Sequence, residues 1–255
     1  MAIAIEQFIC REDNFAVLVH DETSGETAAI DAPEAEPIVA ALDRRGWRLT
    51  HILCTHHHAD HTDGNAALKA RYGARLVAPE AERGRIEGVD QAVEPGDTLA
   101  IGDVRVATID TGGHTSGHLS YHLPGEGVAF TADCLFALGC GRVFEGTMEQ
   151  MHASLQRLVA LPPETVIHCG HEYTKSNAAF ALDVDPDNAA LRERAGEVGR
   201  LRAEGRATLP TRLDRELATN PFLRTGDPAI RDRLGMRDAS DTEVFAALRR
   251  RKDRF

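Results

Sequence analysis

The sequence predicts an α/β fold followed by a C-terminal region that is entirely helical. In the first two thirds of the 255 residues, short runs of β-branched and aliphatic residues alternate with helical stretches. After Tyr173, Ala, Leu, Glu and Arg dominate, and we expect no further strands. These two observations predict a first domain over residues 1–172 and a helical domain over residues 173–255.

Strands are expected wherever a short apolar run is closed by a turn signal. Such runs are Phe15–His20, Ala28–Asp31, His51–Cys54, Arg75–Ala78, Val104–Ile109, Leu119–Leu123, Val128–Thr131 and Thr165–Cys169. Helices are expected between some of them, over Glu34–Arg45 and Asn65–Tyr72. In this alternating arrangement, side chains that carry chemistry should follow the strand ends.

Helix starts are marked by capping boxes. Thr147-Met-Glu-Gln150 has the spacing of a capping box and predicts a helix that ends before Pro162. Asp185-Pro-Asp-Asn188 predicts a turn and a cap, and Ser240-Asp-Thr-Glu243 predicts the start of the last helix. That helix ends in the basic run 249–252, which on its own is usually just a solvated helix end.

Composition and charge exclude several classes of protein. No apolar run approaches the roughly 20 residues that cross a bilayer, and Glu6 stands where a signal peptide has a basic start, so we expect a cytoplasmic protein. A net charge of -11 opposes binding to nucleic acid or anionic lipid, so an anionic substrate would need a local basic patch. Separately from the charge, we expect a monomer with a small-molecule substrate. The five cysteines form no C-x-x-C pair, which indicates buried free thiols.

The strongest chemical signal is Thr55-His-His-His-Ala-Asp-His61, directly after an expected strand. His56 and His58 can point one way while Asp60 and His61 turn toward a neighbouring point, so one loop can serve two metals. Further ligands follow later expected strands. They are His114, Asp133 and His171. Imidazole and carboxylate groups bind Zn, Fe or Mn, so this recurrence at strand ends favours a metal site over scattered histidines.

The other histidines are expected to bind no metal, since most of the 12 histidines in such a chain would serve packing or solubility. His57 should face away from the metals if its neighbours face them. Asp31, at the end of a strand, is a weaker candidate for orienting a ligand imidazole. The remaining histidines are expected in the core, on the surface or behind the ligands: His20, His51, His118, His122, His152 and His168.

In this order, the motif at 55–61, His114, Asp133 and His171 resemble the metallo-β-lactamase superfamily. The resemblance implies a four-layer αββα sandwich with a dinuclear site along one edge. It also implies a ligand set for each metal. Metal one would take His56, His58 and His114, metal two would take Asp60, His61 and His171, and Asp133 would bridge them.

Narrower motifs are similar to the glyoxalase II branch of this superfamily. They are Thr131–Phe136, Gly139–Thr147, Cys169–Tyr173, Asn220–Arg224 and the C-terminal stretch Arg249–Phe255. The resemblance implies hydrolysis of S-(2-hydroxyacyl)glutathione, with S-D-lactoylglutathione as the substrate, in methylglyoxal detoxification. The helical region would hold glutathione.

The resemblance also implies the residues that would bind substrate. Arg249 and Lys252 would bind the carboxylate of the glutathione glycine, and Arg142 and Tyr173 would lie nearer the thioester. The family often has Lys at position 142 and Tyr where this chain has Phe144. The missing hydroxyl would weaken binding by about 0.5–1.5 kcal/mol.

The expected reaction is attack by a hydroxide that two divalent ions, Zn or alternatively Fe or Mn, generate at neutral pH. Asp60 would also hold the bridging water, which makes Asp60 and Asp133 the expected catalytic carboxylates. The alternative is a persulfide dioxygenase with one iron that acts on a glutathione derivative. A nuclease fits less well, because the negative net charge opposes binding of phosphates. A β-lactamase also fits less well, because Cys134 lies beside the bridging position and does not replace it. A silent binding module is a further alternative, which the complete ligand set disfavours.

Overall fold

The computed structural model describes residues 3–255, so the first two residues of the expected 1–172 domain lie outside it. The chain forms two compact units. The first takes the chain up to Asp110 together with Thr115–Phe130, and the second takes Thr111–His114 together with Thr131–Phe255. The domain boundary that the sequence places after residue 172 stays a prediction.

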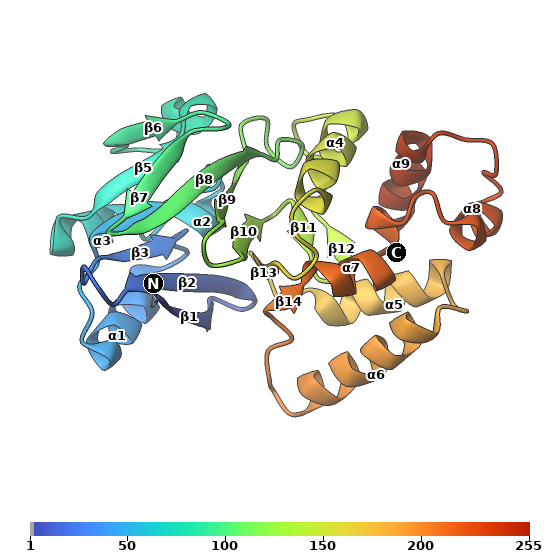
Figure 1. The fold of residues 1–255 in the computed structure, drawn as a ribbon, viewed down its shortest axis with the longest axis horizontal. Coiled ribbons are helices and arrows are strands. Elements are labelled where there is room, and N and C mark those ends of the chain that lie inside the picture. The colour runs from blue at the N-terminus through green and yellow to red at the C-terminus, as the bar shows by residue number, and fades with distance from the viewer. Residues whose placement is uncertain (1–2) are drawn as a thin grey trace. The chain divides into compact units, whose positions relative to one another are not determined.

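A six-stranded sheet lies within the first unit, in the order β1-β2-β3-β4-β5-β6 (Figure 1). Neighbouring strands are antiparallel from β1 to β3 and parallel from β3 to β6. Because parallel strands end at the same edge, β3 and β4 deliver the residues that follow them to one place. The strands are β1 (Ile3–Cys10), β2 (Asn14–Asp21), β3 (Thr27–Ile30), β4 (His51–Leu53), β5 (Arg75–Pro79) and β6 (Gln91–Val93).

Two helices pack on this sheet, α1 (Ala35–Arg45) and α3 (Asn65–Tyr72). Leu42 of α1 and Leu68 of α3 are fully buried in the same apolar cluster as Ile52 of β4. Each such side chain stabilises the fold by about 1.5–3 kcal/mol. Two short helical segments complete the unit, α2 (Ala59–Thr62) and η1 (Glu80–Arg85).

A second six-stranded sheet has the order β14-β13-β10-β9-β8-β7. Within the first unit, its strand β9 faces the first sheet: the buried Tyr121 hydroxyl donates to the Cys54 carbonyl at 2.7 Å, and Leu119 N–H donates to the Thr55 carbonyl at 3.0 Å. The strand β10 begins in the first unit and ends in the second. The strands are β7 (Thr98–Ile101), β8 (Val104–Asp110), β9 (Leu119–Leu123), β10 (Val128–Ala132), β13 (Val166–Cys169) and β14 (Thr211–Arg212).

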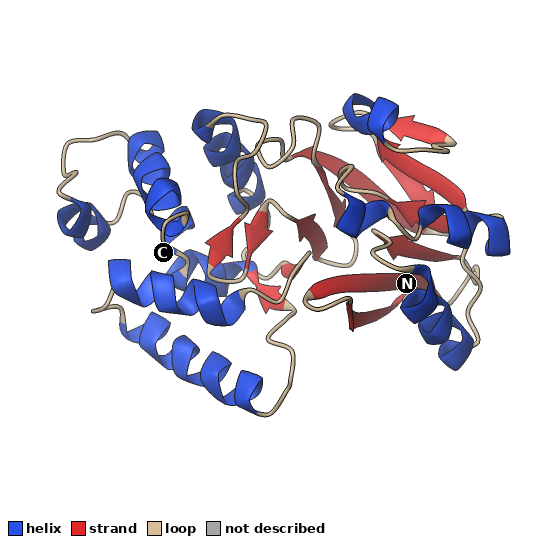
Figure 2. Ribbon diagram, turned by 180° about the vertical axis from the view of Figure 1, so that it is seen from behind, coloured by secondary structure: helices blue, strands red, loops and turns tan. Residues whose placement is uncertain are grey.

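The second unit is mainly helical (Figure 2), which confirms the predicted C-terminal helical region. Both predicted capping boxes are present, at Thr147 and at Ser240, and Asn188 caps its helix as expected. The helices are α4 (Met148–Val159), α5 (Thr174–Val184), α6 (Ala189–Ala203), α7 (Leu213–Thr219), η2 (Pro221–Leu223), α8 (Pro228–Leu234) and α9 (Asp241–Lys252), and a hairpin joins β11 (Leu135–Phe136) to β12 (Gly139–Cys140). Among residues 3–255, no helix is long and apolar enough to span a membrane.

One expectation is wrong: a strand does return after Tyr173. The two residues of β14 pair antiparallel with β13, in the register Val166↔Arg212. Two residues are too few for an alternating pattern to show, and the pairing depends on a partner strand that is distant in the sequence. The first region of the chain contains all the predicted strands, with ends that differ by at most one residue.

A buried carboxylate ties the helices α6 and α7 to the β11–β12 hairpin. Glu216 is fully buried and pairs with the Arg194 guanidinium, which is also buried. The same carboxylate accepts hydrogen bonds from the Thr211 hydroxyl at 2.8 Å and from Leu138 N–H at 2.8 Å. Glu216 is therefore one of the side chains that hold the hairpin after Asp133 from the helical side.

Replacing Glu216 with alanine should lower the free energy of unfolding by about 3–5 kcal/mol, because the Arg194 charge would remain buried without its carboxylate. Urea unfolding followed by circular dichroism would measure this loss. The control is Glu193→Ala on the exposed face of α6, which should change stability by less than about 0.5 kcal/mol. Equal stability of the two variants would contradict the prediction.

Candidate metal centre

The segment 55–61 begins at the edge of the first sheet where β3 and β4 end, and hydrogen bonds to Asp31 hold it at that edge. Thr55 donates its N–H to Asp31 Oδ1 and its hydroxyl to Asp31 Oδ2, both at 2.8 Å. The ring of His61 donates from Nδ1 to the same Oδ2 at 2.8 Å. Asp31 therefore holds both ends of the loop and orients one of its imidazoles, as the sequence suggested.

This network sets the tautomers of two histidines. The Thr55 hydroxyl donates to Asp31, so its oxygen accepts the Nδ1 proton of His56, 2.9 Å away. His61 likewise carries its proton on Nδ1, where Asp31 accepts it. In both rings Nε2 therefore keeps its lone pair, which is the state that a metal ligand requires.

The same loop brings further donor atoms together. His56 Nε2 lies 3.1 Å from His58 Nδ1, and His61 Nε2 lies 3.7 Å from Asp60 Oδ2. Asn14, at the start of β2, donates from Nδ2 to Asp60 Oδ2 at 2.9 Å and to the Asp60 carbonyl at 3.0 Å. Sequence reasoning missed Asn14, because a lone Asn after a turn carries no signal of a partner 46 residues away.

The second unit contributes its own cluster of three predicted ligands, all buried. Asp133 lies between two histidines: Oδ2 is 3.4 Å from His114 Nε2, and Oδ1 is 3.4 Å from His171 Nε2. The Arg142 carbonyl accepts the Nδ1 proton of His114 at 2.9 Å, so the lone pair of Nε2 points toward the carboxylate. Both oxygens of Asp133 thus face imidazole nitrogens, as expected of a bridging carboxylate.

These separations fit a metal better than direct hydrogen bonds. Two ligands at about 2.0–2.2 Å from one ion lie roughly 2.8–3.6 Å apart in octahedral or tetrahedral geometry. The spacings of 3.1 and 3.4 Å fall at or near this range, and 3.4 Å is long for an N–H···O bond. Every donor is an imidazole or a carboxylate, so the residues present suit Zn, Fe or Mn.

Three predicted substrate-binding cations lie in the second unit, and two of them are beside the carboxylate of Asp253. Asp253 Oδ1 lies 3.0 Å from Arg249 Nη2 and 3.6 Å from Arg142 Nε. Lys252 donates to the Ser176 carbonyl at 3.2 Å. Burial and the positive charges of Arg249 and Arg142 hold the pKa of Lys252 below its usual value. A cluster of three cations with one carboxylate suits an anionic group of a ligand.

Arg249 differs from the other two cations because it is buried. Its Nη1 donates to the Cys140 carbonyl at 2.7 Å, and its guanidinium lies 5.2 Å from the centre of the Phe222 ring. The side chain of Arg142, in contrast, is 60% exposed. Arg249 therefore supports the β11–β12 hairpin as well as the cation cluster.

Two exposed aromatic residues flank the predicted ligands of the second unit. The ring of Phe144 lies 5.2 Å from that of His114, and Tyr173 stacks on His171 at 4.7 Å. Both aromatic side chains are exposed, at 61% and 37%. They offer apolar surface beside Asp133 to which a ligand can bind.

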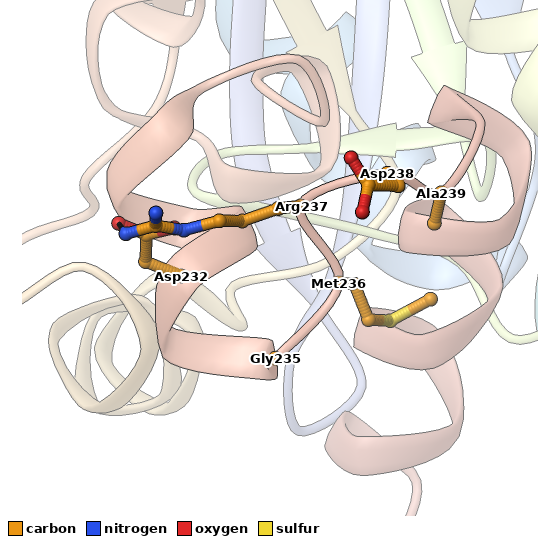
Figure 3. Close-up of a pocket in the computed structure, with 6 residues that line it drawn as sticks. All are labelled: Asp232, Gly235, Met236, Arg237, Asp238 and Ala239. Atoms are coloured by element: carbon orange, nitrogen blue, oxygen red, sulfur yellow. Dashed lines mark hydrogen bonds and ion pairs between the residues drawn. The ribbon is translucent and has the colours of Figure 1, made fainter.

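The pocket of Figure 3 lies elsewhere in the second unit, in the turn between α8 and α9. It has a volume of about 470 Å³ and is lined by residues 232 and 235–239. Asp232 and Arg237 pair with each other across its rim. No residue that the sequence singled out lines this pocket.

Two family models together match nearly the whole chain. Residues 22–171 match the family described as Metallo-beta-lactamase superfamily, and residues 172–255 match Hydroxyacylglutathione hydrolase C-terminus. The hydroxyacylglutathione hydrolase of Mesorhizobium japonicum is 60% identical over all of both chains. That of Brucella anthropi is 58% identical over 99% of this chain and 97% of its own.

Solved structures share the fold. ETHE1 from Myxococcus xanthus matches with a TM-score of 0.69 and 25% identity, over 96% of this chain and 89% of its own. The BLEG-1 B3 metallo-beta-lactamase matches with a TM-score of 0.67 and 21% identity, over 87% of this chain and 100% of its own. With the two sheets and the helical C-terminal region, these matches confirm the predicted fold class.

Proposed function

Since the chain belongs to the hydroxyacylglutathione hydrolases of the metallo-β-lactamase superfamily, we propose that it converts S-D-lactoylglutathione to D-lactate and glutathione at a two-metal centre. The chain is a thioester hydrolase of hydroxyacylglutathione, and the observation that carries this is 60% identity over the full length to a hydrolase of that name. The lactoyl group and the role in methylglyoxal detoxification are our proposal.

The proposed centre takes the ligands that the family resemblance implies. Metal one would take His56, His58 and His114, and metal two would take Asp60, His61 and His171. Asp133 would bridge the two ions. The spacings and tautomers within each unit support this assignment, as does chain connectivity: His114 lies in the loop between β8 and β9, and Asp133 follows β10 directly. Zinc suits these ligands, with iron and manganese as alternatives.

Two bound divalent ions would lower the pKa of a water molecule to about 7 and polarise the thioester carbonyl. Asp60, which Asn14 holds in place, would orient that water by accepting a hydrogen bond from it. The leaving thiol has a pKa near 8.5 and departs as a thiolate, so the chain needs no general acid. A reaction that releases glutathione suits the cytoplasm, and the five buried free thiols suit the same reducing compartment.

Substrate binding would fall to the second unit. Arg249 and Lys252 would bind the carboxylate of the glutathione glycine, Arg142 and Tyr173 would lie nearer the thioester, and Phe144 would also contact the substrate. The cluster of cations around Asp253 and the exposed aromatic rings beside His114 and His171 support this assignment. Because Arg249 is buried against Phe222, its replacement would also disturb packing, and Lys252 is the cleaner position for a test.

Replacing Lys252 with alanine should raise KM for the glutathione thioester about tenfold and leave kcat nearly unchanged, because a charged hydrogen bond to the substrate is lost equally in the ground and transition states. Steady-state kinetics would measure both constants. The matched control is Arg250→Ala, which removes a charge from the exposed face of the same helix and should leave KM unchanged. Equal KM values in the two variants would count against Lys252 as a substrate-binding residue.

The test of the function is kcat/KM for S-D-lactoylglutathione on metal-replete protein, followed by loss of thioester absorbance, with a thioester that lacks glutathione as control. We expect efficient turnover with a strong preference for the glutathione ester. Weak or unselective turnover would contradict the proposed substrate. The mononuclear dioxygenase is the weaker alternative, because relatives that are 56–60% identical over at least 99% of this chain carry the hydrolase name.

A further inference from the structure

We propose that Glu82 is a positioning residue that selectively maintains metal one of the proposed centre. Glu82 lies in the short helix η1 and is only 1% exposed. Its Oε2 accepts the Nδ1 proton of His57. Its Oε1 accepts hydrogen bonds from the Thr115 hydroxyl at 2.7 Å and from Gly117 N–H at 2.8 Å. One buried carboxylate thus joins two segments of the first unit that are far apart in sequence.

The contacts of Glu82 fall on sequence neighbours of all three proposed ligands of metal one. His57 lies between His56 and His58, and Thr115 directly follows His114. Fixing a side chain restricts the backbone dihedral angles on either side of it, so Glu82 restrains three imidazoles without touching any of them. The inference therefore rests on the proposed function, because it assigns a support to the metal centre proposed there.

The close approach of η1 to the segment 115–118 depends on a glycine at position 117. A Cβ atom added at Gly117 would lie 2.6 Å from Ala81 Cβ and 2.9 Å from Glu82 Oε1, closer than side chains tolerate. Glycine at 117 therefore lets the carboxylate reach the backbone N–H. Another acid of η1 behaves differently: Glu80 is half-exposed and lies 3.6 Å from Arg83 Nη1, as ordinary surface acids do.

Asp31 and Glu82 hold the loop at different residues, and of the two only Asp31 contacts a proposed ligand of metal two. Asp31 binds Thr55 and His61, and through Thr55 it orients His56, whereas Glu82 binds the loop at His57. Of the loop residues proposed for metal two, His61 is held directly by Asp31 and Asp60 is held by Asn14. Loss of Glu82 should therefore weaken one metal and spare the other.

The test is a titration of apo protein with Zn²⁺ in the presence of a competing chelator, for the wild type and for Glu82→Ala. We expect one of the two zinc affinities to fall about 10- to 100-fold and the other to stay within about threefold. The KM for the thioester should stay within about twofold, because Glu82 lies outside the proposed substrate-binding residues. The matched control Glu80→Ala, in the same helix, should bind both ions as the wild type does.

Unchanged zinc affinities in a folded Glu82→Ala variant would overturn the inference, and so would an equal fall in both affinities, which indicates general destabilisation. If Glu82→Ala does not fold, Thr115→Val gives the same test, since it removes one hydrogen bond to Glu82 and should weaken the same single site by a smaller factor. Measurements on the wild type distinguish a failure of this inference from a failure of the proposed function. A wild type that binds two zinc ions and hydrolyses the thioester upholds the proposed function whatever Glu82→Ala does.

Discussion

Replacing Asp133 with alanine should lower kcat by about a thousandfold or more, with loss of bound metal. Asp133 is buried, and both of its oxygens lie 3.4 Å from imidazole nitrogens, those of His114 and His171. Its loss would remove one ligand from each of the two proposed ions. Kinetics combined with metal analysis of the purified variant would measure the two losses together.

The matched control for Asp133 is Asp187→Ala, which removes an exposed carboxylate from the same unit and should leave kcat and metal content unchanged. A second variant, Asp133→Asn, keeps the size of the side chain and should be nearly as inactive, because the amide has lost the charge that offsets two cations. An active, metal-replete Asp133→Ala protein would contradict the bridging role.

Removal of the metals by a chelator should abolish hydrolysis, and return of divalent metal should restore it. The imidazole and carboxylate groups of the proposed centre are suited to hold metal ions, and the proposed nucleophile is a hydroxide that the bound ions would generate. Full activity should return at two equivalents of metal per chain. The apo protein should also melt at a lower temperature, since ions that bind only the folded state stabilise it.

Reconstitution also tests the number of metal ions that hydrolysis requires. Full activity on the thioester at a single equivalent of metal would contradict the two-metal centre. A chelated protein that still hydrolyses the thioester would contradict metal catalysis altogether. The non-glutathione thioester serves as the control for unselective hydrolysis in each preparation.

Local features of the chain were readable from the sequence. Both capping boxes form as predicted, because a box involves residues only three positions apart. The close grouping of donors in the 55–61 loop follows from the same kind of short-range geometry, and His57 forms a hydrogen bond through Nδ1 with Glu82. The prediction that ligands follow strand ends also needed only the positions of apolar runs.

Only the tertiary structure decided which distant side chains support those ligands. Asp31 was a weak candidate in the sequence, and Asn14 and Glu82 carried no signal, because their partners lie 24 to 46 residues away and are chosen by strand pairing and packing. The burial of Arg249 could not be predicted either, because the basic run 249–252 suggested a solvated helix end. Sequence therefore determined which groups could bind metal, and tertiary packing determined their tautomers, their supports and their exposure, because those depend on contacts that no local pattern encodes.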